Sequence, residues 1–235
     1  MLLVVLLVTV WAAGGQRAAP TGDGGTDATR LGPFPSEDVG AYLARTRDVA
    51  PGPGPRLALV GFDAALPPAA AAASTAGVGV TVLQAVFRVP LPRVQTALRR
   101  EDLPSAADTG GAGTTAGGPT TAAAMTSVLD AARLRAAADA RADAGAAPPG
   151  RARDVAAAEA ERLAAPCACV IALVVRGDVG PLSALARGPG VRVVEVAAPG
   201  ASTARLAVSP LLPDQGAGRP LGPVVGPVPD DGPIG

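Results

Sequence analysis

The chain of 235 residues contains no histidine, lysine or asparagine, and all 20 of its basic residues are arginine. Without histidine it cannot build a Ser-His-Asp or Cys-His catalytic system, and it offers no imidazole to a metal. Without lysine it lacks the phosphate clamp of a P-loop and the amine of a Schiff base. Carboxylate and thiol chemistry remain, and no motif identifies a reaction. We therefore expect a protein that is not an enzyme and that needs no cofactor.

Aromatic residues make up only 2% of the sequence, so few large side chains can anchor a core. The hydrophobic fraction of 49% is inflated by alanine, and valine and leucine must form the core. The 20 acidic residues balance the 20 basic ones. A nucleic-acid-binding protein would need a basic excess or a basic stripe, so no nucleic-acid partner is expected.

An unbroken apolar run, MLLVVLLVTVWAA, occupies residues 1–13 and is followed by two glycines. Its length fits the apolar region of a signal peptide, about 7–15 residues, and is shorter than the ~20 residues that span a bilayer. Residues 1–15 are interpreted as a secretory signal or as a transmembrane signal-anchor that starts upstream; a buried core helix is the remaining alternative. We expect membrane targeting with an extracytoplasmic domain, or secretion if the segment is cleaved.

Composition divides the rest of the chain into three parts. Residues 16–55 are rich in Gly, Thr, Asp and Pro, which predicts a juxtamembrane linker with one short helix over Ser36–Arg47. Residues 56–208 carry strand and helix patterns and form the predicted domain, with a low-complexity insertion over 105–121. Residues 209–235 are predicted to be a disordered tail rich in Pro and Gly.

The predicted domain begins with a β-α-β unit. Leu57–Phe62 is a short apolar run typical of a buried strand, and Asp63 is placed to cap a following alanine-rich helix. Ala76 and Gly77 end that helix, and the β-branched segment Val78–Val89 predicts the next strand.

A second β-α-β unit follows two alanine-rich helices predicted around residues 122–144 and 154–165. It consists of the strand Cys167–Arg176, a helix capped by Asp178, and the strand Val191–Val196. Two such units joined by a helical insertion predict an α+β fold with a ferredoxin-like sandwich of one sheet and one helical layer.

The sharpest chemical feature is the pair Cys167 and Cys169. At positions i and i+2 of a strand the two side chains point to the same face, where they can form a disulfide or a redox pair in an oxidising compartment. Alternatively, both pack as small hydrophobes. No CxxC motif, histidine or lysine is present to lower a thiol pKa, which favours packing or a structural disulfide over redox activity. Two thiols alone do not make a zinc site, so no metal is expected.

Other candidates for chemistry are weaker. Asp108-Thr109-Gly110 matches the aspartic-protease tripeptide but lies in the low-complexity insertion, which favours a chance match. Glu101 and Asp102 lie in a polar segment and are interpreted as solvated charges. The segment Phe87–Val94, with prolines at alternate positions, is interpreted as a strand end protected from aggregation or as a docking segment.

The order of these parts resembles a family of uncharacterised membrane-anchored proteins of high-GC Gram-positive bacteria. The resemblance spans most of residues 36–215 and is carried by AYLARTR (41–47), ALVGFD (58–63), FRVPLPRVQT (87–96), CACVIALVVRG (167–177), GVRVVEV (190–196) and PLLPDQ (210–215). It implies a membrane protein without an assigned activity, and no functional residue is carried over from it.

We therefore expect a membrane-anchored, extracytoplasmic interaction or structural protein, whose partners are the membrane and an envelope protein. A thiol-redox protein that uses Cys167 and Cys169 is the alternative, and a propeptide-like protease inhibitor is a third reading. The sequence does not indicate the oligomeric state.

Overall fold

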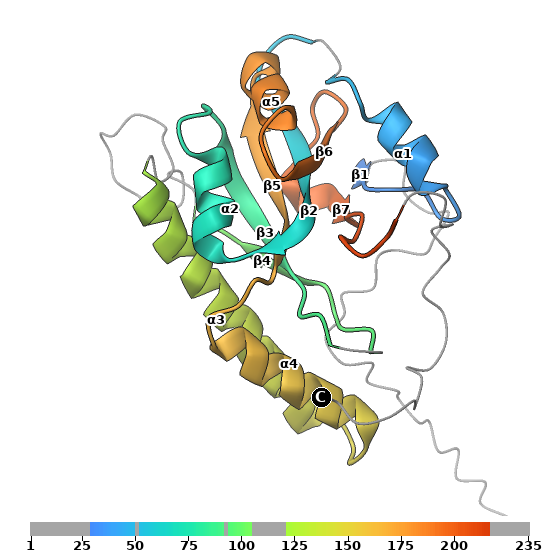
Figure 1. Ribbon diagram of the computed structural model, residues 1–235, viewed down its shortest axis with the longest axis vertical. Helices are drawn as coiled ribbons and strands as arrows, with labels where there is room; N and C mark the ends of the chain where they lie inside the picture. Colours follow the sequence, from blue (N-terminus) through green and yellow to red (C-terminus); the bar gives the residue numbers. More distant parts are fainter. Residues whose placement is uncertain (1–28, 50–51, 92–93, 105–120, 217–235) are drawn as a thin grey trace, which may run out of the picture.

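The computed structural model describes residues 29–49, 52–91, 94–104 and 121–216 (Figure 1). The apolar helix predicted over residues 1–15 and the protease-like tripeptide lie outside this part of the chain. Within the described part, no helix combines the length and the apolar character that crossing a bilayer requires.

The main element is a five-stranded antiparallel sheet with the strand order β4-β3-β5-β2-β6. Its strands are β2 (Arg56–Leu66), β3 (Thr81–Phe87), β4 (Arg99–Asp102), β5 (Val170–Gly177) and β6 (Val191–Val196). A second, smaller sheet pairs β1 (Thr29–Leu31) with β7 (Leu206–Val208) in parallel.

Five α-helices are described, together with a 3-10 turn over Thr203–Arg205. They are α1 (Val39–Arg45), α2 (Pro68–Thr75), α3 (Ala122–Ala146), α4 (Arg151–Ala164) and α5 (Val179–Ala186). The predicted α+β class is confirmed at this level: a mixed fold with an antiparallel sheet, a small parallel sheet and helices.

Each predicted β-α-β unit is split by a strand of the other unit. β2 and β3, joined through α2, are both antiparallel to β5, which lies between them. β5 and β6, joined through α5, are both antiparallel to β2, which lies between them. The two units therefore interlock in one sheet, because each pairs with a strand of the other rather than with its own.

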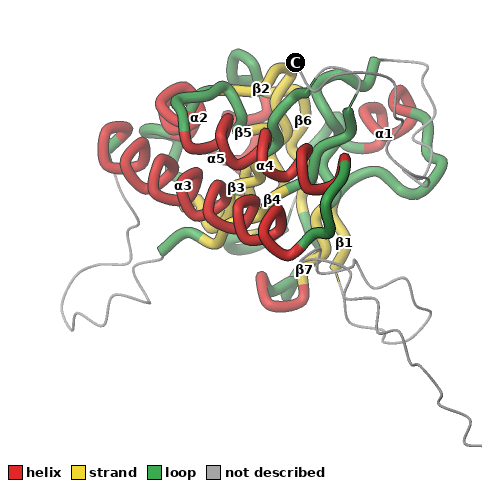
Figure 2. The backbone as a smooth tube through the Cα atoms, turned by 90° about the horizontal axis from the view of Figure 1, so that it is seen from below, coloured by secondary structure: helices red, strands yellow, loops and turns green. Residues whose placement is uncertain are grey.

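The larger core fills the space between one face of the sheet and helices α2 to α5, which gather on that side of the strands (Figure 2). β5 supplies the centre because its apolar run, VIALVV, is buried on both faces. Contributions come from Val60, Phe62, Phe87 and Leu173 of the strands and from Ala71, Leu129, Ala136, Leu163 and Leu182 of the helices. Alanine is the commonest residue on the helix side of this core, and a few leucines supply its larger side chains.

The other face of the sheet carries a second core. It joins Leu57, Leu59, Val86, Ile171 and Val174 of the main sheet to Leu31 of β1 and Leu206 of β7. Residues 29–49, predicted to be linker, therefore belong to the folded domain. Leu211 is 1% exposed and packs with Tyr42 and Val193, so the first residues of the predicted tail belong to it as well.

Two predicted helix starts differ from the structure. The first helix is predicted to start at Ser36, but α1 begins at Val39 and Asp38 caps it: its Oδ1 accepts hydrogen bonds from the backbone N–H groups of Gly40 and Ala41 at 2.7 and 3.2 Å. Asp63 was assigned the cap of the second helix, but it lies within β2, and α2 begins at Pro68. The strand continues past Asp63 because Leu66 pairs again with β5.

The strand β4 was not predicted because its sequence, RRED, consists only of charged residues. It forms one edge of the main sheet and pairs with β3. Charged residues are a common protection of edge strands against pairing with other chains. β3 is thus an internal strand, and Val89, Leu91 and Val94 beyond its end are buried, so the described residues of the segment 87–94 do not form a free docking edge.

Candidate functional site

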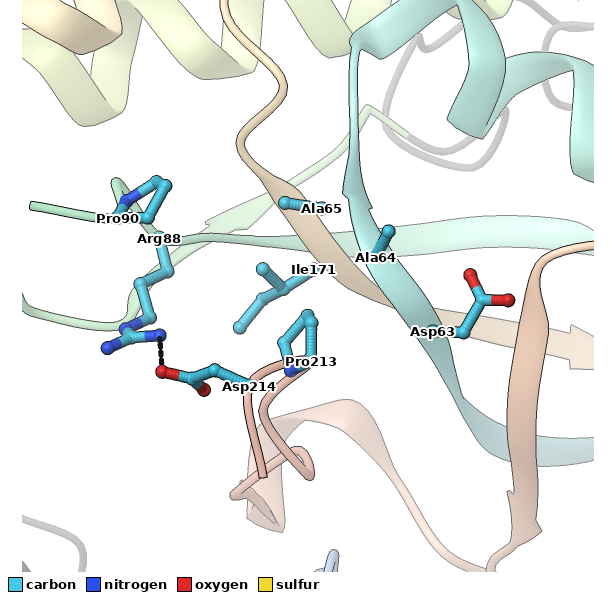
Figure 3. A pocket seen from close by; sticks show the side chains of 8 residues that line it. All are labelled: Asp63, Ala64, Ala65, Arg88, Pro90, Ile171, Pro213 and Asp214. Carbon is cyan, nitrogen blue, oxygen red and sulfur yellow. Dashed lines mark hydrogen bonds and ion pairs between the residues drawn. The ribbon is translucent and has the colours of Figure 1, made fainter. Parts of the chain in front are cut away.

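A pocket of about 350 Å³ opens on the face of the sheet opposite the helical layer (Figure 3). Its walls come from β2, from the end of β3, from the start of β5 and from the segment after Leu212. The lining residues are Asp63, Ala64, Ala65, Arg88, Pro90, Ile171, Pro213 and Asp214. Five of these eight side chains are apolar, and the other three are charged.

An irregularity in β2 shapes the wall of the pocket that this strand forms. The pairing of β2 with β5 runs to Gly61 and resumes only at Leu66, which pairs with Val170. The residues between Gly61 and Leu66 do not pair regularly with β5, as in a β-bulge. They line the pocket with two alanines and one carboxylate. The backbone N–H of Asp63 donates to the carbonyl of Gly190 at 3.1 Å, which ties this wall to the turn before β6.

Arg88 supplies the only positive charge among the lining residues. Its side chain is 12% exposed, and its Nη1 lies 3.3 Å from Oδ2 of Asp214, whose side chain is 65% exposed. The Nε atom of Arg88 is buried and has no hydrogen-bond partner among the described residues. The guanidinium is therefore held by one long contact to an exposed carboxylate, which leaves capacity for another acceptor.

The disulfide Cys167–Cys169 shortly precedes Ile171, a lining residue of the pocket, in the sequence. The backbone N–H of Cys169 donates to the carbonyl of Leu66 at 3.1 Å, and the N–H of Arg88 donates to the carbonyl of Cys169 at 2.9 Å. Cys169 thus joins the two strands that form the pocket walls. Its side chain is fully buried on the helical side, and that of Cys167 is partly exposed, so the sulfurs lie on the other face of the sheet from the pocket.

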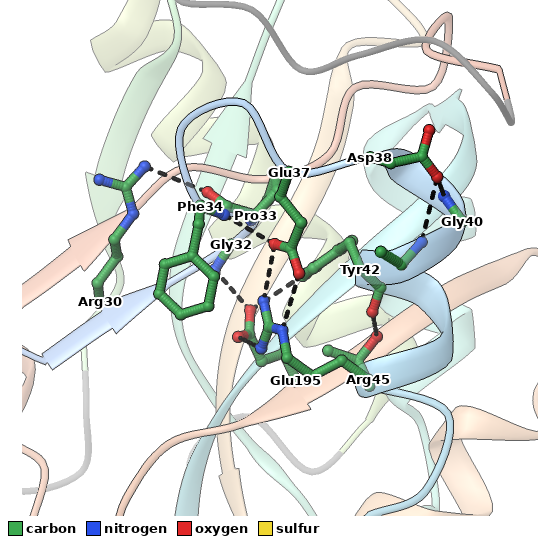
Figure 4. A network of polar contacts seen from close by, with 12 residues as sticks. Arg30, Gly32, Pro33, Phe34, Glu37, Asp38, Gly40, Tyr42, Arg45 and Glu195 are labelled. Carbon is green, nitrogen blue, oxygen red and sulfur yellow. Dashed lines mark hydrogen bonds and ion pairs between the residues drawn. The ribbon is translucent and has the colours of Figure 1, made fainter.

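A second polar cluster lies where α1 meets the edge strand β6 (Figure 4). Glu195, whose side chain is 9% exposed, accepts hydrogen bonds from the N–H of Gly32 at 2.5 Å, from the hydroxyl of Tyr42 at 3.1 Å and from Arg45 at 2.9 Å. Arg45 also pairs with Glu37 at 3.0 Å. All contacts come from residues 29–49, so this cluster fastens the N-terminal segment to the sheet.

The cluster shifts the pKa values of Tyr42, Arg45 and Glu37. Burial, followed by the neighbouring charge of Glu195, raises the pKa of the Tyr42 hydroxyl above its usual range. Hydrogen bonding to Glu37 raises the pKa of Arg45, and the same contact lowers the pKa of Glu37. Tyr42 therefore remains a neutral donor and Glu195 its acceptor, an arrangement suited to holding two segments together.

A third set of contacts fastens β4 to the helical hairpin that α3 and α4 form. Arg99, 11% exposed, pairs with Asp143 of α3 at 2.9 Å and with Glu159 of α4 at 2.8 Å. Glu101, expected to be solvated, is 9% exposed and pairs with Arg135 at 3.1 Å. Burial raises the pKa of Glu101, and the pairing with Arg135 opposes that shift. These groups are enclosed by their partners, so we interpret them as structural.

The described residues contain no group of three or more His, Cys, Asp or Glu side chains that would hold a metal ion. The chemistry that the pocket offers is binding: one guanidinium, two carboxylates and an apolar floor. The pocket was not predicted from the sequence because its walls come from four segments that are distant in the chain. A single arginine such as Arg88 does not by itself indicate a binding site. In comparisons with protein-family models, curated proteins and solved structures, none matched.

Proposed function

We propose that this chain is a non-enzymatic binding module on the outer side of a cell membrane, tethered or exported through residues 1–15. The observation that carries the proposal is the disulfide Cys167–Cys169, because disulfides persist in oxidising compartments such as the cell envelope. The pocket beside Arg88 supports the binding role, since it presents a charged group above an apolar floor without a nucleophile and base in reach of each other. An envelope protein is the proposed partner.

We also propose that the domain is a variant of the ferredoxin-like sandwich. Support comes from the order β6-β2-β5-β3, in which two split strand-helix-strand units interlock under α2 and α5. The strand β4 and the hairpin of α3 and α4 are then additions between the two units. Domains of this shape serve many functions, so the proposal rests on analogy for the fold and on the pocket for the function.

The competing proposal, a thiol-redox protein, is favoured by one observation: Cys167 is partly exposed, so a thiol of a partner can approach its sulfur. The buried Cys169 opposes it. Native protein treated with a reducing thiol at a defined potential discriminates the two roles. A binding module keeps its disulfide over the range in which cellular dithiol proteins are reduced, whereas a redox protein exchanges it readily.

The experiment that tests the binding-module proposal follows the full chain, tagged at its C-terminus, in a bacterial host. We expect the tag in the membrane or the secreted fraction, degradation of the domain by protease added to spheroplasts, and modification of the cysteines by a maleimide only after reduction. The N-terminal residue of the mature protein separates an anchor from a cleaved signal. Protection from external protease together with free cysteines would contradict the proposal.

A further inference from the structure

The pocket beside Arg88 has the size and lining of a small-molecule site. Its volume of about 350 Å³ lies at the lower end of the ~300–1,000 Å³ of ligand pockets, which suits a ligand of a few carbon atoms. Ala64, Ala65 and Ile171 form an apolar floor between charged residues (Figure 3). A ligand that fills this space therefore needs a short aliphatic body.

Arg88 indicates the polar group of that ligand. A guanidinium presents five N–H donors in a planar fork, and the side chain of Arg88 uses one nitrogen, in a 3.3 Å contact with the exposed Asp214. A planar carboxylate can form two shorter, parallel hydrogen bonds with such a fork. Asp214 is 65% exposed, so solvent weakens the pairing that the ligand would displace. A ligand carboxylate can therefore replace Asp214 at little cost.

Asp63 indicates that the ligand carries no second negative charge. This carboxylate is exposed and also lines the pocket, and it has no positively charged neighbour among the lining residues except Arg88. A second negative charge on the ligand would meet Asp63 or Asp214 without a further cation to balance it. The pocket therefore discriminates against dicarboxylates.

We propose that this pocket binds an aliphatic monocarboxylate, with the carboxylate on the guanidinium of Arg88 and the aliphatic chain against Ala64, Ala65 and Ile171. The inference deepens the proposed binding function by naming the ligand chemistry. The same group is carried by a free short-chain acid and by the C-terminal residue of a peptide. Both sources present one carboxylate on a branched or linear aliphatic chain.

Ligand-observed NMR on the full chain in lipid nanodiscs tests the proposal. The probes are isovalerate, isovaleramide, glutarate, and a tripeptide that ends in valine with a free or an amidated C-terminus. We expect binding of isovalerate, or of the free-acid peptide, or of both, and at least tenfold weaker binding of the amide, the dicarboxylate and the amidated peptide. The probe that binds identifies the source of the carboxylate.

Variants locate the site. Arg88→Gln should abolish binding, and Asp214→Asn should strengthen it several-fold by removing the competing carboxylate; a purely structural ion pair would make both variants bind more weakly. Arg176→Gln, at an exposed arginine of β5, is the matched control and should bind as the wild type. Equal binding of isovalerate and isovaleramide, no binding of any probe, or weaker binding by Asp214→Asn would overturn the site. The expected membrane topology and disulfide can both be found even if the ligand site is overturned. The test of the site and the test of the proposed function can therefore fail independently.

Discussion

Gly32 shows how one residue sets the position of a whole segment. Its φ of +118° lies in the range that side-chain-bearing residues avoid, and a Cβ built there would come within 1.9 Å of the carbonyl oxygen of Ser209. Its N–H is also one of the three donors to Glu195. Backbone conformation, close packing and a buried hydrogen bond therefore all depend on the missing side chain.

We expect Gly32→Ala to lower the free energy of unfolding by more than ~1 kcal/mol, because the native backbone is incompatible with a Cβ. The matched control is Gly180→Ala in α5, where a Cβ meets nothing within 4 Å. That change should be neutral or stabilising by up to about 1 kcal/mol. Urea unfolding of both variants measures the difference, and equal effects would contradict the role assigned to Gly32.

Two glutamates should give opposite pH dependences of stability. The folded-state pKa of Glu37 is lowered, chiefly by hydrogen bonds from Arg45, so its contribution is present above the unfolded-state pKa of about 4.3 and is lost as the pH falls through the folded value. The pKa of Glu101 is raised, chiefly by burial, so its contribution is present below about 4.3 and is lost as the pH rises through the folded value.

Unfolding free energies measured from about pH 3 to about pH 7 check this prediction in two variants. The advantage of the wild type over Glu37→Gln should grow as the pH rises. Its advantage over Glu101→Gln should shrink, and can reverse, over the same range. Parallel curves for the wild type and either variant would mean that the carboxylate in question keeps its ordinary pKa on folding.

At the scale of elements, β4 is held by ion pairs rather than by apolar contacts of its own. Arg99 contacts Asp143 and Glu159, and Glu159 also accepts the N–H of Ala97 at 2.6 Å. A buried pair broken on one side leaves an uncompensated charge, which typically costs about 3–5 kcal/mol. The helical hairpin and the edge strand therefore depend on each other.

We expect Arg99→Met to destabilise the protein by about 3 kcal/mol, since it leaves Glu159 buried without its cation. Arg141→Met, at an exposed arginine of the same helical hairpin, is the control and should change stability by less than about 0.5 kcal/mol. Hydrogen exchange of the α3 and α4 amides should rise in the Arg99 variant alone. Unchanged exchange there would show that the hairpin packs independently of β4.

The disulfide acts on the pocket through the backbone of Cys169. Replacing both Cys167 and Cys169 by serine should cost about 1–2 kcal/mol of stability, because the closed loop is very short. The change should also weaken isovalerate binding, since Cys169 holds the backbone of Arg88 and Leu66. Wild-type protein in excess reductant should behave like the variant, and unaltered binding in both would assign the disulfide to stability alone.

At the scale of the whole molecule, the N-terminal segment 29–49 connects the predicted membrane segment to the sheet. Its attachment has an apolar part, Tyr42 against Val193 and Leu211, and a polar part centred on Glu195. The folded domain therefore begins before residue 56, and any tension from the N-terminus would act first on β1, which pairs with β7, and then on the Glu195 cluster.

Glu195→Ala should loosen that attachment, because the donors of Gly32 and Tyr42 lose their acceptor. We expect trypsin to cleave after Arg45 and Arg47 several-fold faster in this variant, with the rest of the domain intact. Glu161→Ala, at an exposed glutamate of α4, should be cleaved like the wild type. Equal cleavage of all three proteins would place the main attachment in the apolar contacts.

Local patterns were sufficient for the elements with a continuous apolar or alanine-rich run. The strand over Cys167–Arg176 and the helix around residues 122–144 were predicted from apolar runs and alanine content, and they correspond to β5 and α3. They could be predicted because a strand buried on both faces has a continuous apolar run, and a long alanine-rich segment favours a helix. The charged β4 and the linker-like β1 have no such run, so neither was predicted.

The sequence by itself determined the α+β class, the missing histidine and lysine chemistry and the presence of two strand-helix-strand units, because these depend on composition and on neighbouring residues. Only the tertiary structure decided that the units interlock, that Glu195 fastens residues 29–49, and that Arg88 meets Ala64, Ile171 and Asp214 in one pocket. The physical reason is the pairing of strands that are distant in the chain, since contacts across a sheet depend on register and order rather than on local pattern.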